Sequence, residues 1–211
     1  MGQYYKPVFL NEDKTEVKAY AYSHDFNNGL KLMEHSWMKN DFVRFIENAL
    51  ILEPQYLVWA GDYADPEMDL PDEILAKFVN EDVTLKELKE EGVTLYHMTN
   101  NATKITHNEE VKKFDYSHDF KCIAPLNYKY LINYDKKQFV DKSKTPKSND
   151  GWQIHPLPLL TCEGNGRGGG DFHGESSLIG AWSRDKIGVV SKKSDIPKGF
   201  KEIIFDLAEN F

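Results

Sequence analysis

The stretch that decides the fold is Tyr4-Tyr5-Lys6-Pro7-Val8-Phe9-Leu10-Asn11, at residues 4 to 11. Aromatic and β-branched residues dominate it, as they do residues 17 to 23, and a polar turn at 11 to 14 separates the two runs. Short runs of these residue types around a polar turn are typical of a β-hairpin. The sequence therefore predicts that a hairpin begins the fold.

A second hairpin of the same kind is predicted at residues 128 to 141. It begins Tyr128-Lys129-Tyr130-Leu131-Ile132-Asn133-Tyr134-Asp135, and two lysines then lead into a second run at 138 to 141. Each hairpin is followed by a variable stretch and then by a short apolar run, at 56 to 60 in the first half and 187 to 190 in the second. Short apolar runs between turn residues are typical of buried strands. The two halves therefore share one pattern.

We interpret the halves as two diverged ββ-x-β repeats, residues 3 to 65 and 127 to 191, that share one core. A single unit of that size would be unable to bury both faces of its strands. Chance similarity between short strand patterns is the alternative. Residues 66 to 126 are predicted to be a helical and irregular insertion, and residues 1 to 211 to be a single globular unit.

The remaining pattern predicts a few helices and a linker. Apolar residues from 30 to 52 recur at three- and four-residue steps, which indicates one amphipathic helix, or two broken near Lys39-Asn40 with Asp41 as the cap of the second. Residues 142 to 151 are rich in Lys, Ser, Asn, Asp and Pro and are predicted to be an exposed linker. A further strand is expected at 179 to 182. The predicted fold class is α+β, with a mainly antiparallel sheet and a few helices.

Composition excludes several classes of protein. The chain has 211 residues, 40% of them hydrophobic, which is enough to build a core and excludes global disorder. Its net charge of -8 argues against nucleic acid as a partner, because phosphate contacts need a clustered excess of Lys and Arg. Cys122 and Cys162 lie far apart without a CxxC motif, so neither a zinc site nor a disulfide is suggested. With no secretion signal and no apolar run long enough to span a bilayer, we expect a cytoplasmic protein with no membrane partner.

The strongest local motif is the glycine-rich segment from Glu163 to Gly174, which contains six glycines. Exposed backbone N–H groups in such a loop can wrap an anion, and Arg167 adds a planar fork suited to phosphate or carboxylate. The segment lacks the Gly-Lys-Ser/Thr of a P-loop, and its glycines match the Rossmann spacing only through their abundance. The loop is predicted to bind a ligand; the alternative is a flexible surface loop that tolerates glycines.

Scattered blocks of the sequence resemble a loose family of bacterial and phage proteins of unknown activity. They are the N-terminal Met1-Gly2-Gln3-Tyr4-Tyr5, the segment from Gly29 to Glu34, the segment from Trp59 to Asp65, and Asn165-Gly166-Arg167-Gly168-Gly169-Gly170-Asp171. In the shorter relatives a Trp, an Asp-Arg-Ile strand and then Gly-Asp-Tyr follow the loop. Here Trp182 leads through Arg184 into residues 187 to 190, and Gly61-Asp62-Tyr63 lies in the first half, as in a duplicated family whose halves kept different elements. The resemblance implies no activity, and it supports the choice of the glycine-rich loop.

Polar and aromatic residues at the ends of two predicted strands complete the predicted site. Asp62 and Tyr63 follow the buried run at 56 to 60, and Trp182 and Arg184 have the matching place in the second half. A ring stacked on Trp182 with its polar edges read by nearby groups would suit a nucleotide-like ligand. Core packing of the tryptophans and a surface ion pair of Arg184 are the alternatives.

These features lead to a hypothesis of a non-enzymatic protein that binds a small anionic, nucleotide-like ligand, with no cofactor and no metal. Its alternatives are a phage-encoded acidic protein that inhibits a host or defence protein through residues 62 to 82, and a hydrolase that uses Asp171 and His173. No motif for nucleophilic catalysis is present, so no catalytic residue is assigned. The predicted ligand-binding residues are Asn165, Gly166, Arg167, Gly168, Gly169, Gly170, Asp171, His173, Trp182, Arg184, Asp62 and Tyr63.

Overall fold

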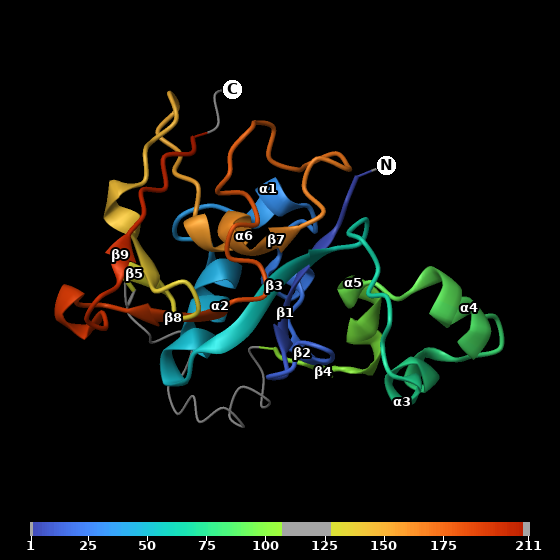
Figure 1. Ribbon diagram of the computed structural model, residues 1–211. Helices are drawn as coiled ribbons and strands as arrows, with labels where there is room; N and C mark the ends of the chain where they lie inside the picture. Colours follow the sequence, from blue (N-terminus) through green and yellow to red (C-terminus); the bar gives the residue numbers. More distant parts are fainter. Residues whose placement is uncertain (1, 107–127, 209–211) are drawn as a thin grey trace.

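The computed structural model describes residues 2–106 and 128–208, which build one mixed sheet with helices on both faces (Figure 1). The sheet has nine strands, in the order β4-β2-β1-β3-β8-β5-β6-β9 with β7 paired to β3. The strands are β1 (Tyr5–Leu10), β2 (Val17–Tyr20), β3 (Gln55–Gly61), β4 (Thr103–Lys104), β5 (Tyr130–Asn133), β6 (Gln138–Asp141), β7 (Cys162–Glu163), β8 (Lys186–Val190) and β9 (Lys201–Glu202). The α+β class, the mainly antiparallel sheet and both predicted hairpins are confirmed.

The strand order has the same arrangement in its two halves. In the first half β1 lies between β2 and β3, and in the second β5 lies between β6 and β8, all antiparallel. At the outer edges β4 runs parallel to β2 and β9 parallel to β6, while β3 and β8 meet antiparallel at the centre. This is the arrangement expected of two ββ-x-β units in one sheet. A duplication of the sequence stays a prediction.

Most of the helices are short, and one longer helix covers the sheet near its centre. The helices are α1 (Leu32–His35), α2 (Asp41–Leu52), α3 (Asp72–Leu75), α4 (Leu85–Glu91), α5 (Leu95–Met98) and α6 (Pro156–Thr161). Single 3₁₀ turns occur at Ser23–Phe26, Ala76–Phe78, Thr99–Asn101, Lys142–Lys144 and Lys193–Asp195.

Residues 30 to 52 form two helices, which confirms one of the two predicted alternatives. The predicted cap of the second helix, Asp41, is wrong. α1 ends at His35, and Lys39, in the stretch before α2, has a left-handed backbone with φ 69 that keeps the two helices separate. The side chain of Asn40 accepts hydrogen bonds from the N–H groups of Phe42 and Val43, at 3.0 and 3.3 Å, so Asn40 caps α2 and Asp41 is its first residue.

Alternating side chains of β3 build two cores on opposite faces of the sheet. Leu57 and Trp59 point into the larger core, which α2 and α6 cover. Val58 and Ala60 point the other way, into a smaller core with residues of α3, α4 and α5. This alternation follows from the two-residue period of a strand. In Figure 1, α1 and α6 lie above the sheet, and α3, α4 and α5 form a lobe to the right.

Two predictions about the second half are wrong. Residues 179 to 182 form turns and no strand, because Gly180 and Trp182 donate their N–H groups to carbonyls of α6, at 2.8 and 2.7 Å, instead of to a neighbouring strand. Most of residues 142 to 151 are exposed, as predicted, but the segment is folded and is no linker. Thr145 and Ser148 are buried, and Ser148 and Trp152 exchange hydrogen bonds that fold the segment back on itself.

Candidate functional site

The parallel pairing of β3 and β7 brings the predicted loops together. Trp59 pairs with Cys162 and Ala60 with Glu163. Because parallel strands end on the same side of a sheet, the loop from Asp62 and the glycine-rich loop leave the sheet side by side. The sheet therefore joins two of the motifs that the sequence separates by about a hundred residues.

The glycine-rich loop is closed around its own aspartate. Asp171 Oδ2 accepts hydrogen bonds from the backbone N–H groups of Gly166, Arg167 and Gly168, at 2.8, 3.0 and 3.0 Å. Its Oδ1 accepts one from the Tyr5 hydroxyl at 3.1 Å, and Asp171 is 1% exposed. Burial, together with the Asp171 carboxylate, raises the pKa of Tyr5, which stays a neutral donor. The amides predicted to wrap a ligand thus already wrap a carboxylate of the chain.

The rest of the loop is also bonded internally. The Asn165 side chain accepts from the N–H of Phe172 at 2.9 Å and donates to its carbonyl at 3.2 Å. Gly169 forms a bridge with Gly2, and the Gly170 carbonyl accepts from the N–H of Met33 at 3.0 Å. These contacts describe a folded turn held against the N-terminal strand and α1, which argues against the flexible-loop alternative.

Replacing Gly168 with alanine should destabilise the protein by roughly 1–3 kcal/mol, the usual cost of overpacking. A Cβ there would lie 2.5 Å from both the backbone N and the Cβ of Gln3, a buried residue two positions before β1. Gly169→Ala is the matched control, because its Cβ would meet its nearest neighbour at 3.7 Å. Urea unfolding of both variants measures the difference, and equal midpoints would contradict the packing described here.

Arg167 and Arg184 line a cavity of about 400 Å³, and each guanidinium contacts at least one carboxylate. Arg167 Nη1 donates to the Tyr63 carbonyl at 2.8 Å and to Asp65 Oδ1 at 2.7 Å. Arg184 lies between Glu67 and Glu163, donating to each at 2.8 Å. The hydrogen bonds to Glu163 and Glu67 raise its pKa despite burial. With three carboxylates around two guanidiniums, this cavity repels an anion.

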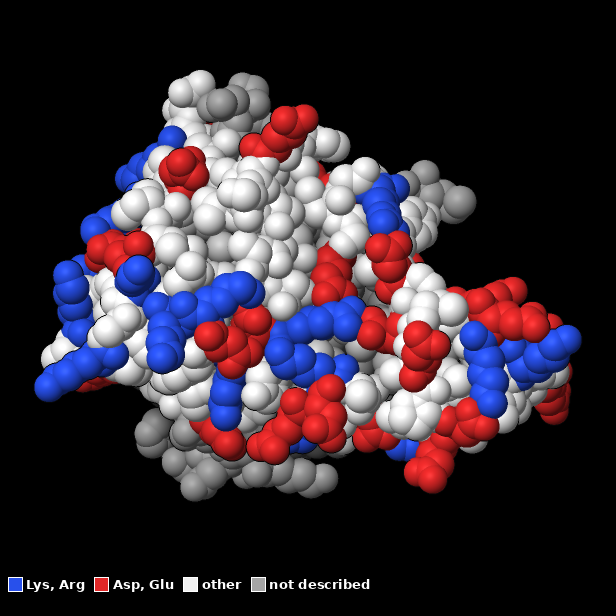
Figure 2. Space-filling view, viewed as in Figure 1, with Lys and Arg blue, Asp and Glu red and all other residues white. Residues whose placement is uncertain are grey.

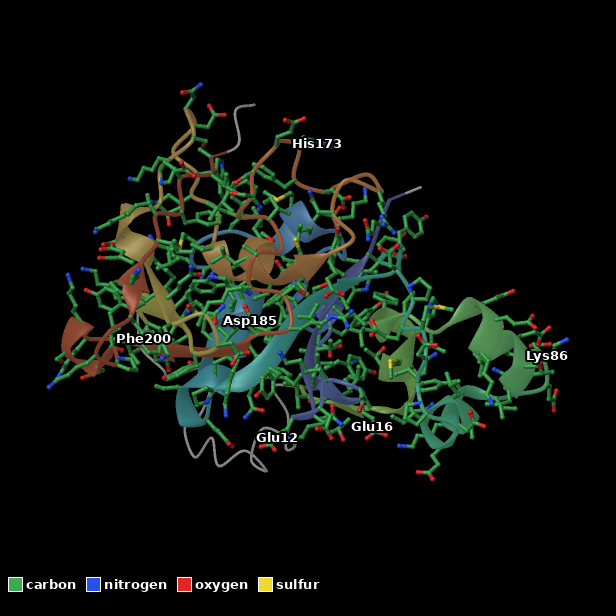
Figure 3. The ribbon with its side chains drawn as sticks, viewed as in Figure 1. Glu12, Glu16, Lys86, His173, Asp185 and Phe200 are labelled. Carbon is green, nitrogen blue, oxygen red and sulfur yellow. The ribbon has the colours of Figure 1, made fainter. Side chains whose placement is uncertain are left out.

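The other predicted residues are divided between the core and the surface. Trp182 is fully buried and donates its Nε1–H to Gln138 Oε1 at 2.9 Å, so no ring can stack on it, and this part of the prediction is wrong. Asp62 Oδ1 accepts from the N–H of Tyr4 at 2.9 Å and fixes the start of its loop. His173 is exposed at the outer end of the glycine-rich loop (Figure 3). Asp171, in contrast, is buried and bonded to Tyr5. The two do not form the acid–base pair that a hydrolase would need.

A second cavity, of about 570 Å³, has the opposite charge. It lies between α2, the start of β5, the 3₁₀ turn after β6 and the N-terminus of α6. Five basic side chains and one carboxylate line it. The lining residues are Met38, Lys39, Arg44, Glu47, Tyr128, Lys129, Lys142, Ser143, Lys147, Gln153, His155 and Ser191. We call it the basic cavity.

Glu47, Lys142 and His155 form a buried cluster in the wall of the basic cavity. Their side chains are 3%, 10% and 2% exposed. His155 Nδ1 accepts from the N–H of Leu157 at 3.2 Å, so a neutral ring carries its proton on Nε2, which lies 3.3 Å from Glu47 Oε1. Lys142 Nζ donates to the same oxygen.

The charge states of the cluster follow from its contacts. Burial alone would raise the pKa of Glu47, but His155 and Lys142 lower it by more, so the carboxylate stays ionised. Burial lowers the pKa of His155, which favours the neutral ring. The hydrogen bond to Glu47 therefore fixes the position of the Lys142 ammonium group in the wall of the basic cavity.

The cations around the mouth of the basic cavity are less fully paired. Arg44 contacts the exposed Asp41 at 3.1 Å, and Lys129 contacts Asp141 at 3.5 Å. Lys39 and Lys147 are exposed and have no ion-pair or hydrogen-bond partner among residues 2–106 and 128–208. Two free ammonium groups facing one cavity make it the strongest site for an anion among the cavities described above.

Sequence reasoning missed the basic cavity, although two signals pointed to it. Glu47 is a carboxylate on the apolar face of α2, between Ile46 and Leu50, and such a charge needs a partner. Lys142 and Lys147 lie in the segment that was interpreted as a linker. Neither signal shows which segments meet.

The described residues offer neither a reactive thiol nor a metal site. Burial raises the pKa of the Cys162 thiol to about 12, so this thiol is unreactive. No cluster of His, Cys, Asp or Glu suited to a metal occurs in the described part of the chain. The second cysteine, Cys122, and the pair His118-Asp119 lie outside the described residues. No helix of the described part could cross a bilayer.

The acidic segment from residue 62 to 82 contains one lysine, Lys77, and α4 adds Lys89 beside it. Lys77 pairs with Glu16, and Lys89 with Asp72 at 2.7 Å. Figure 2 shows red and blue side by side on the lobe of α3 and α4. On the face shown, the lobe therefore has a mixed surface, and the hypothesis of an acidic docking face at residues 62 to 82 stays a prediction.

The chain matches no family model, no curated protein and no solved structure with which it was compared.

Proposed function

We propose that the protein binds a small anionic ligand in the basic cavity. The observation that carries this proposal is the group of five basic side chains there, of which Lys39 and Lys147 have no ion-pair partner in the described part of the chain, on a chain whose net charge is -8. Like charges crowded at one cavity cost free energy unless a partner of opposite charge offsets them. An anionic ligand is such a partner.

The shape and chemistry of the basic cavity fit a phosphate- or carboxylate-bearing molecule. Its volume of about 570 Å³ lies within the range of about 300–1,000 Å³ typical of small-molecule sites. Lys142 offers a fixed ammonium, and Arg44 offers a planar fork that can bind two oxygens at once. Lys39 and Lys147 are free to close on the ligand from two sides. The glycine-rich loop then has a structural role, in place of the binding role expected from its sequence.

A thermal-shift screen tests the proposal with phosphate, pyrophosphate, tripolyphosphate, nucleotides and sugar phosphates. A compound at 100 times its Kd should add about 2.7 kcal/mol to the free energy of unfolding of the wild type. The double variant Lys39→Gln/Lys147→Gln should lose most of this gain, since it removes the two unpaired cations. Its stability without ligand should be unchanged, because both side chains are exposed.

The matched control is Lys86→Gln/Lys198→Gln, which changes the net charge equally at exposed positions away from the cavity. This control should respond to ligands like the wild type. Equal loss in both double variants would mean that only the overall charge matters, and no shift with any compound would contradict the proposal.

A further inference from the structure

A third cavity, of about 560 Å³, adjoins the basic cavity. Its lining residues are Glu34, Trp37, Met38, Lys39, Asn40 and Trp152, and it shares Met38 and Lys39 with the basic cavity. We call it the aromatic cavity. The two cavities therefore meet at one ammonium group, with cations on one side and indole rings on the other.

Trp152 presents an indole ring to solvent in a fixed position. It is 57% exposed, which is unusual for so large an apolar side chain. Its ring lies edge-on to that of Trp37, with centroids 5.6 Å apart, and Trp37 is itself fixed by a 2.6 Å hydrogen bond to the Met33 carbonyl. The backbone of Trp152 exchanges two hydrogen bonds with Ser148, at 2.8 and 3.0 Å. An exposed ring that rests against a second indole is suited to stack on a flat ligand.

The polar residues of the aromatic cavity indicate which end of a ligand it would take. The Asn40 side chain is occupied, because its oxygen caps α2 and its amide donates to Asn28 at 2.7 Å. Glu34 places a carboxylate in the lining, which repels phosphate. A phosphate would therefore enter the basic cavity and an uncharged ring the aromatic one.

We infer that the ligand is a nucleoside phosphate whose base stacks on Trp152 while its phosphates lie among Lys39, Lys142 and Lys147. This inference rests on the proposed anion binding in the basic cavity and adds the class of ligand. Lys39, at the junction of the two cavities, contacts the ligand between base and terminal phosphate. The base contributes affinity through stacking, which is tolerant of its identity.

Titration calorimetry with ATP and with inorganic tripolyphosphate tests the inference, because both bear a triphosphate and only ATP has a base. Wild type should bind ATP more tightly. Trp152→Ala should weaken ATP binding by roughly 5- to 150-fold and leave tripolyphosphate binding unchanged. Trp152→Phe should retain part of the affinity for ATP. Tyr63→Ala, which removes an exposed ring beside the glycine-rich loop, should change neither.

The outcomes separate the two claims. If tripolyphosphate binds and ATP gains nothing from Trp152, the inference is overturned and the basic cavity stands as an anion site. If neither compound binds the wild type, both the inference and the anion site are contradicted. Melting temperatures of the variants equal to that of the wild type show that loss of ATP binding reflects the removed ring, since Trp152 is an exposed side chain.

Discussion

Replacing Asp171 with alanine should lower the free energy of unfolding by roughly 3–5 kcal/mol, near the upper end for single substitutions. The Asp171 carboxylate accepts hydrogen bonds from three backbone N–H groups and from the Tyr5 hydroxyl. Alanine leaves all four donors without this acceptor, and removing one partner of a buried charged contact costs about 3–5 kcal/mol. In a chain of this length, the melting temperature should fall by roughly 6–20 °C. Urea unfolding followed by circular dichroism measures the change.

Two control variants separate the parts of this effect. Tyr5→Phe removes only the hydroxyl, which donates to the carboxylate, and should cost about 1.5–3 kcal/mol. Asp65→Ala removes an exposed aspartate that contacts the same loop through Arg167 and should leave the melting temperature almost unchanged. If Asp171→Ala unfolded at the same urea concentration as the wild type, the closed loop described here would be contradicted.

Replacing Glu47 with leucine should also destabilise the protein by roughly 3–5 kcal/mol, the cost of leaving a buried cation unpaired. Glu47 is the shared acceptor of Lys142 and His155, and leucine would leave both without it. Glu47→Gln keeps an acceptor of the same shape and should have a smaller effect. Glu202→Leu breaks the more exposed pair with Lys144 and should have little effect.

A double variant distinguishes loss of the ion pair from loss of packing. Glu47→Leu/Lys142→Met removes both charges and should be more stable than Glu47→Leu alone, since no buried charge is left over. The four free energies of unfolding form a double-mutant cycle. If the double variant were less stable than either single variant, the cluster would be held by packing and the electrostatic explanation would be wrong.

The sequence predicted best what depends on neighbours along the chain. Both hairpins and the break between α1 and α2 follow from periodicity and turn residues, which act locally. The direction of the glycine-rich loop was not predictable in this way. Its amides face inward because they bind Asp171, which is held by a hydrogen bond from Tyr5 at the other end of the sequence. A glycine-rich pattern alone does not show whether the amides bind a ligand or a carboxylate of the chain.

The basic cavity escaped prediction for the same physical reason. Arg44 comes from α2, Lys129 from the residue before β5, and Lys142 from the turn after β6, and only the packing of α2 across the sheet assembles them. At Trp182 the sequence predicted a binding site that the structure does not contain. An aromatic residue next to Arg184 suggested a stacking site, but burial decides whether a ring can be reached, and Trp182 is fully enclosed. Arg184 is in turn saturated by two carboxylates.

The most direct test of the central claim is to locate a bound anion by amide chemical-shift mapping with tripolyphosphate. Anion binding in the basic cavity predicts that the largest shifts occur at Lys39, Lys142, Ser143 and Lys147, with Gly166 and Arg167 unaffected. Shifts centred on Gly166 and Arg167 would contradict this account and return the site to the glycine-rich loop.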